Sequence, residues 1–418
     1  MKGKSALMAG VAAVALIATA QAGFAGKARS DEMSNSSAMP AGVSQEQYDQ
    51  LSQRVDALEA ELQQSEIREA ADHDKVESWK SVSGWWDNTS ISGRMYWDIT
   101  NLDLKNNGTA SKNNGTSFDI KRFYVGIDHK FNDTFSANVT TDVTYDSNIS
   151  VSQVYIKKAY LQAKLDPAFT VRVGSADMPW IPYAEGVYGY RFVENTLIDR
   201  TKFGASADWG VYLLGDLADG LVSYEFSATT GAGYKKIVRS NSPDFEGRVS
   251  FKYEGLQLAV GGYAGKLGTT HGTSRKTATR FDAIGAYTFE GLKVGVEYFT
   301  ASDWAYAPGM SSVTDTTHGD GYSPFASYQF DPEWSVFGRY DYVKPYSDTM
   351  HKMYHNTYYN IGIDYRPTKI VDIALVYKHD AGSNGYFGDS NGTIGGTAFA
   401  MGNNGTDNEI GLWGDFQW

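Results

Sequence analysis

The chain lacks cysteine, has few prolines and contains no long apolar run beyond its first residues. Its 418 residues include no Cys and only 10 Pro. Without Cys the fold cannot depend on disulfide bonds, and c-type haem attachment and thiolate metal sites are excluded. A helix that spans a membrane needs about 18 consecutive apolar residues. No such run occurs after position 25, so the sequence excludes a helical membrane protein.

An excess of basic residues is also missing. Lys and Arg number 37 against 49 Asp and Glu, and the formal net charge is −12. This balance argues against a nucleic-acid partner. Aromatic residues and glycine are abundant, with 28 Tyr, 20 Phe, 10 Trp and 44 Gly. Such a composition favours β-strands, tight turns and the aromatic girdles of membrane barrels.

The first residues predict export. Residues 1–22 have the three parts of a secretory signal peptide: Lys2 and Lys4, an apolar stretch over 7–18, and the small-x-small site of residues 20–22. The mature protein is expected to begin directly after this site.

The next two segments predict a leader followed by a helix. Residues 23–43 are rich in Ser, Ala, Gly and Met, as in flexible linkers. Over residues 44–78 apolar side chains recur at spacings of three and four, which is a coiled-coil seam. The seam consists of Tyr48, Leu51, Val55, Leu58 and Leu62. Because it fades after about two heptads, two interpretations remain: a periplasmic coiled coil that aids oligomerisation, or a lone amphipathic helix packed on another surface.

Residues 79–418 predict an outer-membrane β-barrel. Period-2 alternation recurs in segment after segment, and short and long connections alternate between the segments. The short connections are 132–134, 166–167, 218–220, 254–255, 290–291, 331–333 and 366–368. The long ones are 103–117, 146–152, 177–200, 230–243, 267–277, 302–321, 344–355 and 380–407. Seven turns and eight loops separate sixteen antiparallel strands, with both ends on the periplasmic side and the long loops outside.

The two faces of these strands differ in polarity. In the last strand Ile410, Leu412 and Phe416 share one face, whereas Glu409 and Asp415 lie on the other. A barrel of sixteen strands is too wide for side chains to fill. The apolar faces are therefore expected to meet lipid and the polar faces to line water.

The order of parts resembles the phosphate-selective porin O and P family. The resemblance covers roughly residues 45–418. It rests on the leucine seam, the strand segments 90–96, 121–126, 159–161 and 171–174, and the long third loop from Met178-Pro179-Trp180 to Arg191-Phe192-Val193-Glu194-Asn195. It implies a homotrimeric channel of sixteen strands in which the third loop folds inward and narrows the lumen.

Charged residues on the polar faces and in the third loop are the candidate pore-lining residues. They are Arg122, Lys158, Lys164, Arg172, Arg191, Glu194, Arg200 and Lys202. Acids stand against these bases, which is typical of a general diffusion pore whose transverse field penalises apolar solutes. A phosphate- or anion-selective channel is one alternative. A structural or adhesive barrel that does not conduct, with its helix bound to peptidoglycan, is another.

No motif predicts an enzyme, a cofactor or a metal site. His351 and His355 are four residues apart, a metal spacing only in a helix, and here they fall in an external loop. The sequence contains no Gly-x-Ser-x-Gly elbow, and phosphate loops and dinucleotide fingerprints are absent. Membrane lipid and small hydrophilic solutes or inorganic ions are the expected partners of the barrel.

Overall fold

The computed structural model describes residues 86–112, 114–146, 151–268, 276–304, 317–347, 355–383 and 404–418, together with six residues of the segment before the barrel. Those six are Gln50, Gln53, Arg54, Val55, Leu58 and Leu62, and all are helical. The predicted signal peptide, the leader and the rest of the coiled-coil segment lie outside the described residues.

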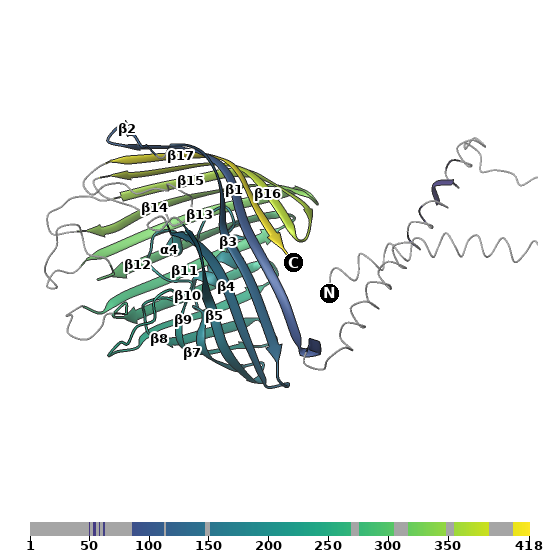
Figure 1. Cartoon of the computed structure of the whole chain (residues 1–418), viewed down its shortest axis with the longest axis vertical. Coiled ribbons are helices and arrows are strands. Elements are labelled where there is room, and N and C mark those ends of the chain that lie inside the picture. The colour runs from purple at the N-terminus through teal and green to yellow at the C-terminus, as the bar shows by residue number, and fades with distance from the viewer. Residues whose placement is uncertain are drawn as a thin grey trace, which may run out of the picture. The chain divides into compact units, whose positions relative to one another are not determined.

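The described chain after residue 85 consists almost entirely of antiparallel strands (Figure 1). The elements are η1 (Trp86–Asn88), β1 (Thr89–Asn106), β2 (Thr109–Ala110), β3 (Gly115–Lys130), β4 (Phe135–Asp146), β5 (Val151–Asp166), β6 (Phe169–Asp177), α3 (Ile181–Tyr188), α4 (Leu197–Arg200), β7 (Ala207–Leu217), β8 (Val222–Thr229), β9 (Asp244–Tyr253), β10 (Leu256–Gly265), β11 (Ala278–Phe289), β12 (Leu292–Ser302), β13 (His318–Asp331), β14 (Trp334–Ser347), β15 (His355–Thr368), β16 (Val371–Ser383) and β17 (Gly405–Gln417).

The strands close into a barrel. Each long strand pairs with its neighbours in sequence, and β1 pairs with both β3 and β17 (Figure 1). The short β2 only adds a ladder to the end of β1. The wall therefore has sixteen strands, as predicted, and closure leaves no unpaired sheet edge.

Two-residue turns join several strands at one end of the barrel. Glu254 and Gly255 have φ values of 41° and 88°, and Glu290 and Gly291 have 45° and 84°. Positive φ at both central residues is the requirement of a type I′ hairpin turn, which is why glycine is the second residue of each pair. Six of the seven short connections predicted from the sequence coincide with turns between consecutive strands of the structure.

The seventh turn lies beyond its predicted place. β15 runs through Thr368, and the turn to β16 follows at residues 369–370. The ladder is irregular between Tyr365 and Thr368. Pro367 has no N–H to donate, so it occupies the irregular part of the strand instead of the turn.

The predicted alternation of faces is confirmed along most strands. In β12, Val294, Val296 and Tyr298 are exposed on the outer face, whereas Glu297 and Phe299 are buried on the inner face. The outer face is apolar. The inner face carries charges, but it also carries large apolar side chains such as Phe299, and these pack against the third loop.

Candidate functional site

The third loop, residues 178–206, connects β6 to β7 and is largely buried. Trp180, Ile181, Phe192 and Leu197 from this loop have exposures of 0–1%. They form one apolar cluster with inner-face residues of distant strands, among them Phe299, Phe325, Phe337 and Trp413. The loop therefore packs on the inside of the wall, and the inner face is apolar where the loop covers it.

The two halves of the third loop meet at Glu297 of β12. The backbone N–H of Trp180 donates to Glu246 Oε1 at 2.9 Å, and its indole Nε1 donates to Glu297 Oε1 at 2.9 Å. The N–H of Leu197 donates to the other oxygen of Glu297 at 3.1 Å. One carboxylate thus holds both the residue before α3 and the first residue of α4.

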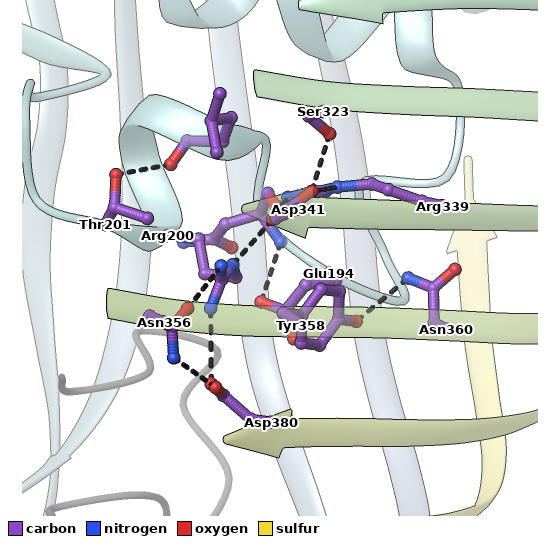
Figure 2. A network of polar contacts seen from close by, with 12 residues as sticks. Glu194, Arg200, Thr201, Ser323, Arg339, Asp341, Asn356, Tyr358, Asn360 and Asp380 are labelled. Carbon is purple, nitrogen blue, oxygen red and sulfur yellow. Dashed lines mark hydrogen bonds and ion pairs between the residues drawn. The ribbon is translucent and has the colours of Figure 1, made fainter. Parts of the chain in front are cut away.

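Arg200, the last residue of α4, is enclosed by acceptors from three strands (Figure 2). Its Nε donates to Asp341 Oδ2 at 2.8 Å, Nη1 to Asp380 Oδ2 at 3.2 Å and Nη2 to Asn356 Oδ1 at 2.9 Å. The guanidinium also lies 4.5 Å from the ring centroid of Tyr358. Arg200 and Asp341 have no exposed side-chain surface, so this contact is a buried anchor.

Arg339 strengthens the same anchor. It donates to both oxygens of Asp341, at 2.7 and 2.6 Å, and its Nη1 donates to the carbonyl of Asn195 at 2.6 Å. Asp341 therefore lies between two guanidiniums, one from the loop and one from the wall (Figure 2). The second half of the third loop is fixed to β14, β15 and β16.

The tip of the third loop contacts two lysines. Lys378 Nζ lies 3.4 Å from Glu194 Oε2, and Lys121 Nζ donates to the carbonyl of Val193 at 3.3 Å. Both ammonium groups lie near the Trp413 ring, at 4.2 Å for Lys378 and 5.3 Å for Lys121. The loop thus reaches β3, which β4 and β5 separate from β6, where the loop begins, and also β16, which lies further around the wall.

A cavity of about 660 Å³ remains between the first part of α3 and the wall formed by β1 and β3–β6. Its charged lining residues are Arg94, Asp128, Lys157, Lys158, Asp177, Glu185 and Arg191, and its tyrosines are Tyr96, Tyr124 and Tyr160. The cavity is therefore polar, with both signs of charge facing it, as expected of a lumen that admits water and ions.

Two β-bulges change which residues face this interior. In β3, Tyr96 pairs with Arg122 but Trp97 pairs with Ile120, so Lys121 is an extra residue. In β5, Thr140 pairs with Lys158 but Thr141 pairs with Ile156, so Lys157 is extra. A bulge places two consecutive side chains on one face. Lys121 and Lys157 consequently point inward beside Arg122 and Lys158.

The structure separates the eight predicted pore-lining residues into groups. Lys158 and Arg191 line the cavity, paired with Asp177 at 2.9 Å and with Glu185 at 2.5 Å. Three others have different surroundings: Arg122 contacts Asp142 at 3.1 Å, Arg172 donates to Gln162 at 2.8 Å, and Glu194 is buried against Lys378. Arg200 is enclosed in its anchor, and Lys164 and Lys202 are exposed.

Sequence reasoning missed Lys121 and Lys157, because strict alternation assigns them to the lipid face. It also missed Glu297, Asp341 and Lys378, whose partners come from the third loop.

The side chain of Arg191 carries a stable positive charge. Burial opposes that charge, but Glu185 and Tyr124 outweigh the effect and raise the pKa of Arg191 above its usual value. The arginine therefore stays protonated, and keeps its ion pair with Glu185, at any physiological pH.

Within the described ranges, no group of three or more His, Asp or Glu side chains is placed to hold a metal ion. Among the same residues, no helix has both the length and the apolar character needed to cross a membrane.

Comparison with solved structures places the fold among outer-membrane porins. An anion-selective porin from Comamonas acidovorans matches with a TM-score of 0.57 and 12% identity, over 78% of this chain and 99% of that one. The outer-membrane channel DcaP of Acinetobacter baumannii matches with a TM-score of 0.54 and 11% identity, over 79% and 97%. OmpT of Vibrio cholerae matches with a TM-score of 0.53 and 14% identity, over 79% and 97%. The class that the fold defines is the porin-type β-barrel.

The family resemblance has support from the sequence itself. The model of the family described as "Phosphate-selective porin O and P" matches residues 90–181, which run from β1 to the start of α3. The predicted resemblance to this family is confirmed over that part of the chain. No curated protein sequence matches.

Proposed function

We propose that the chain forms an outer-membrane channel through which small hydrophilic solutes and inorganic ions diffuse down their gradients. The observation that carries this proposal is the charged cavity of about 660 Å³ beside the third loop. A barrel whose interior were only a folding core would have no reason to keep seven charged side chains around such a space.

In this proposal the third loop is the constriction of the channel. Its apolar side packs on the wall of β10–β14, β16 and β17, and Pro182, Glu185 and Arg191 face the remaining space. Because Glu297, Asp341 and Lys378 fix the loop at three places, its position would set the size limit for solutes.

The outer face suits a membrane. Apolar side chains such as Val260, Phe281 and Leu375 are about half exposed there and would contact lipid. The short turns would then lie in the periplasm with the segment before β1, and the long loops outside.

We also propose a homotrimer. One of the similar solved structures, OmpT of Vibrio cholerae, is described as a trimer form. In this chain the helix expected over residues 44–78 would support contacts made by the barrel, or would bind peptidoglycan.

The experiment that tests this function is the single-channel current of the purified, folded protein in a planar bilayer. Discrete current steps in KCl are expected. A barrel that inserts, shows the gel shift of a folded barrel on heating and never conducts would contradict the proposal. The protein would then belong to the structural or adhesive class, whose lumen is closed by the apolar packing of the third loop.

A further inference from the structure

The basic residues that line the cavity differ in whether an acid neutralises them. Arg94 donates to Asp415, with Nη2 2.5 Å from Oδ2. Lys158 is 2.9 Å from Asp177, and Arg191 is 2.5 Å from Glu185. Paired charges of opposite sign largely cancel each other's field at the distance of a passing ion.

Lys157 has no such partner. Its Nζ lies 3.4 Å from the hydroxyl of Tyr124 and 4.6 Å from the centroid of that ring. No carboxylate of the described residues lies within 4 Å of it. A tyrosine ring attracts a cation but carries no net charge, so no ion pair neutralises Lys157, and Glu185 and Asp177 act on its charge only from a longer distance.

One acid of the cavity also lacks an ion pair. Asp128 accepts a hydrogen bond from Asn138 Nδ2 at 2.8 Å and is exposed near the end of β3. Water and salt screen an exposed charge far more than a half-buried one. The negative charge of Asp128 therefore offsets the positive charge of Lys157 only in part.

The position of Lys157 depends on the bulge of β5. Ile156 remains on the outer face, where it is 46% exposed, and Lys157 and Lys158 both line the cavity. Without the extra residue, Ile156 would face out and Lys158 would follow directly on the inner face. The bulge thus adds one lysine to the lumen without moving the rest of the strand to the wrong face.

We propose that Lys157 determines the ion selectivity of the channel, because among the described residues it is the one basic side chain in the lining of the cavity that forms no ion pair. It attracts anionic solutes into the cavity, while the paired residues Lys158 and Arg191 shape the cavity and contribute little to the sign of the preference. This inference rests on the proposed channel function.

The test is the reversal potential under a KCl gradient for Lys157→Gln, a variant that removes the charge but keeps a polar side chain. The chloride-to-potassium permeability ratio is expected to fall about threefold. Lys164→Gln is the matched control, because Lys164 lies on the same strand and face but is exposed near the turn at Pro167. It is expected to leave the ratio within measurement error.

A second variant, deletion of residue 157, removes the lysine together with the bulge and is expected to lower the ratio to the same extent.

An unchanged ratio in Lys157→Gln, with wild-type conductance, would overturn the inference and leave the channel function standing. A wild-type protein that never conducts would instead contradict the channel function itself.

Discussion

At the scale of single residues, the third loop is held by charged side chains that have no exposure to solvent. Arg200 reaches Asp341, Asn356 and Asp380 at once and lies over Tyr358 (Figure 2). Desolvated charges stabilise a structure only when their hydrogen bonds are satisfied, and here the guanidinium finds an acceptor at each of its three nitrogens. Arg200 is consequently an anchor, although its place in the sequence predicts a pore-lining residue.

Substitution of this anchor should loosen the loop. Arg200→Met leaves Asp341 and Asp380 buried with one partner fewer, at a cost of about 3 kcal/mol in the free energy of unfolding. We expect a lower thermal unfolding temperature and a noisier, larger single-channel current. Lys202→Gln is the control, since Lys202 is exposed two residues away. Equal stability and equal current noise in Arg200→Met and wild type would show that the loop does not depend on Arg200.

At the scale of elements, the barrel closes where β1 meets β17 (Figure 1). Gly93 and Trp418 exchange backbone hydrogen bonds of 3.0 and 3.2 Å across this seam. The indole of Trp418 lies directly over Gly93, where an added Cβ would be 1.8 Å from the ring. Only glycine leaves space for the indole, which also packs on Phe123 and Phe416.

A side chain at Gly93 should therefore disturb closure. Gly93→Val is expected to reduce the yield of folded barrel on refolding into detergent micelles, measured by the shift in gel mobility on heating. Met95→Val, the next outward residue of the same strand, should refold like wild type. If the cause is the clash, Trp418→Ala should recover part of the yield in Gly93→Val. A Gly93→Val protein that refolds normally would contradict the packing described for this seam.

Much of the element structure follows from the sequence, because a strand with one face in lipid must alternate. The strand count, six of the seven turns and the two faces were predictable from this rule. The bulges were not predicted, because strict alternation of faces contains none. Their effect can nevertheless be recognised in the sequence. The outward apolar residues of β3 occupy even positions at Phe118 and Ile120 and odd positions from Phe123 onward. The outward residues thus shift from even to odd positions at Lys121 and Arg122, and this shift marks the bulge at which both basic side chains point inward.

The contacts of the third loop could not be predicted in the same way. Glu297 and Lys378 lie on the polar faces of their strands, like many other charged residues. Their neighbours in the sequence do not indicate that Glu297 binds Trp180 or that Lys378 binds Glu194. These pairs join residues 117 and 184 positions apart. They depend on how the loop crosses the interior, which is a property of the closed barrel.

At the scale of the whole molecule, the outer face is an apolar surface and the inner face divides into a packed part and an open part. The third loop packs on the inner wall of β10–β14, β16 and β17 and leaves the charged cavity against β1 and β3–β6. This division explains how a barrel with apolar residues on both faces can keep a polar cavity, because most of the large apolar side chains of the inner face pack against the loop.

A charge on the outer face should oppose insertion. Val260 is 53% exposed on that face in the middle of β10. Val260→Arg is expected to cost about 2–4 kcal/mol if this position lies at the bilayer midplane. The measurement is the denaturant concentration at which the barrel unfolds from lipid vesicles. Val260→Leu should behave like wild type, and equal stability of all three proteins would show that this face does not contact lipid.

We expect ions to pass through the cavity between the third loop and the wall of β1 and β3–β6. The chain has no Cys, so a single introduced thiol reports on one position. Ser92 lines the cavity, and its neighbour Ile91 is 58% exposed on the outer face. The decisive measurement is the single-channel current of Ser92→Cys and Ile91→Cys before and after a charged, water-soluble methanethiosulfonate reagent. We expect the reagent to reduce the current of Ser92→Cys and to leave Ile91→Cys unchanged. A Ser92→Cys channel that is labelled, as shown by mass spectrometry, and conducts as before would show that ions do not pass through this cavity.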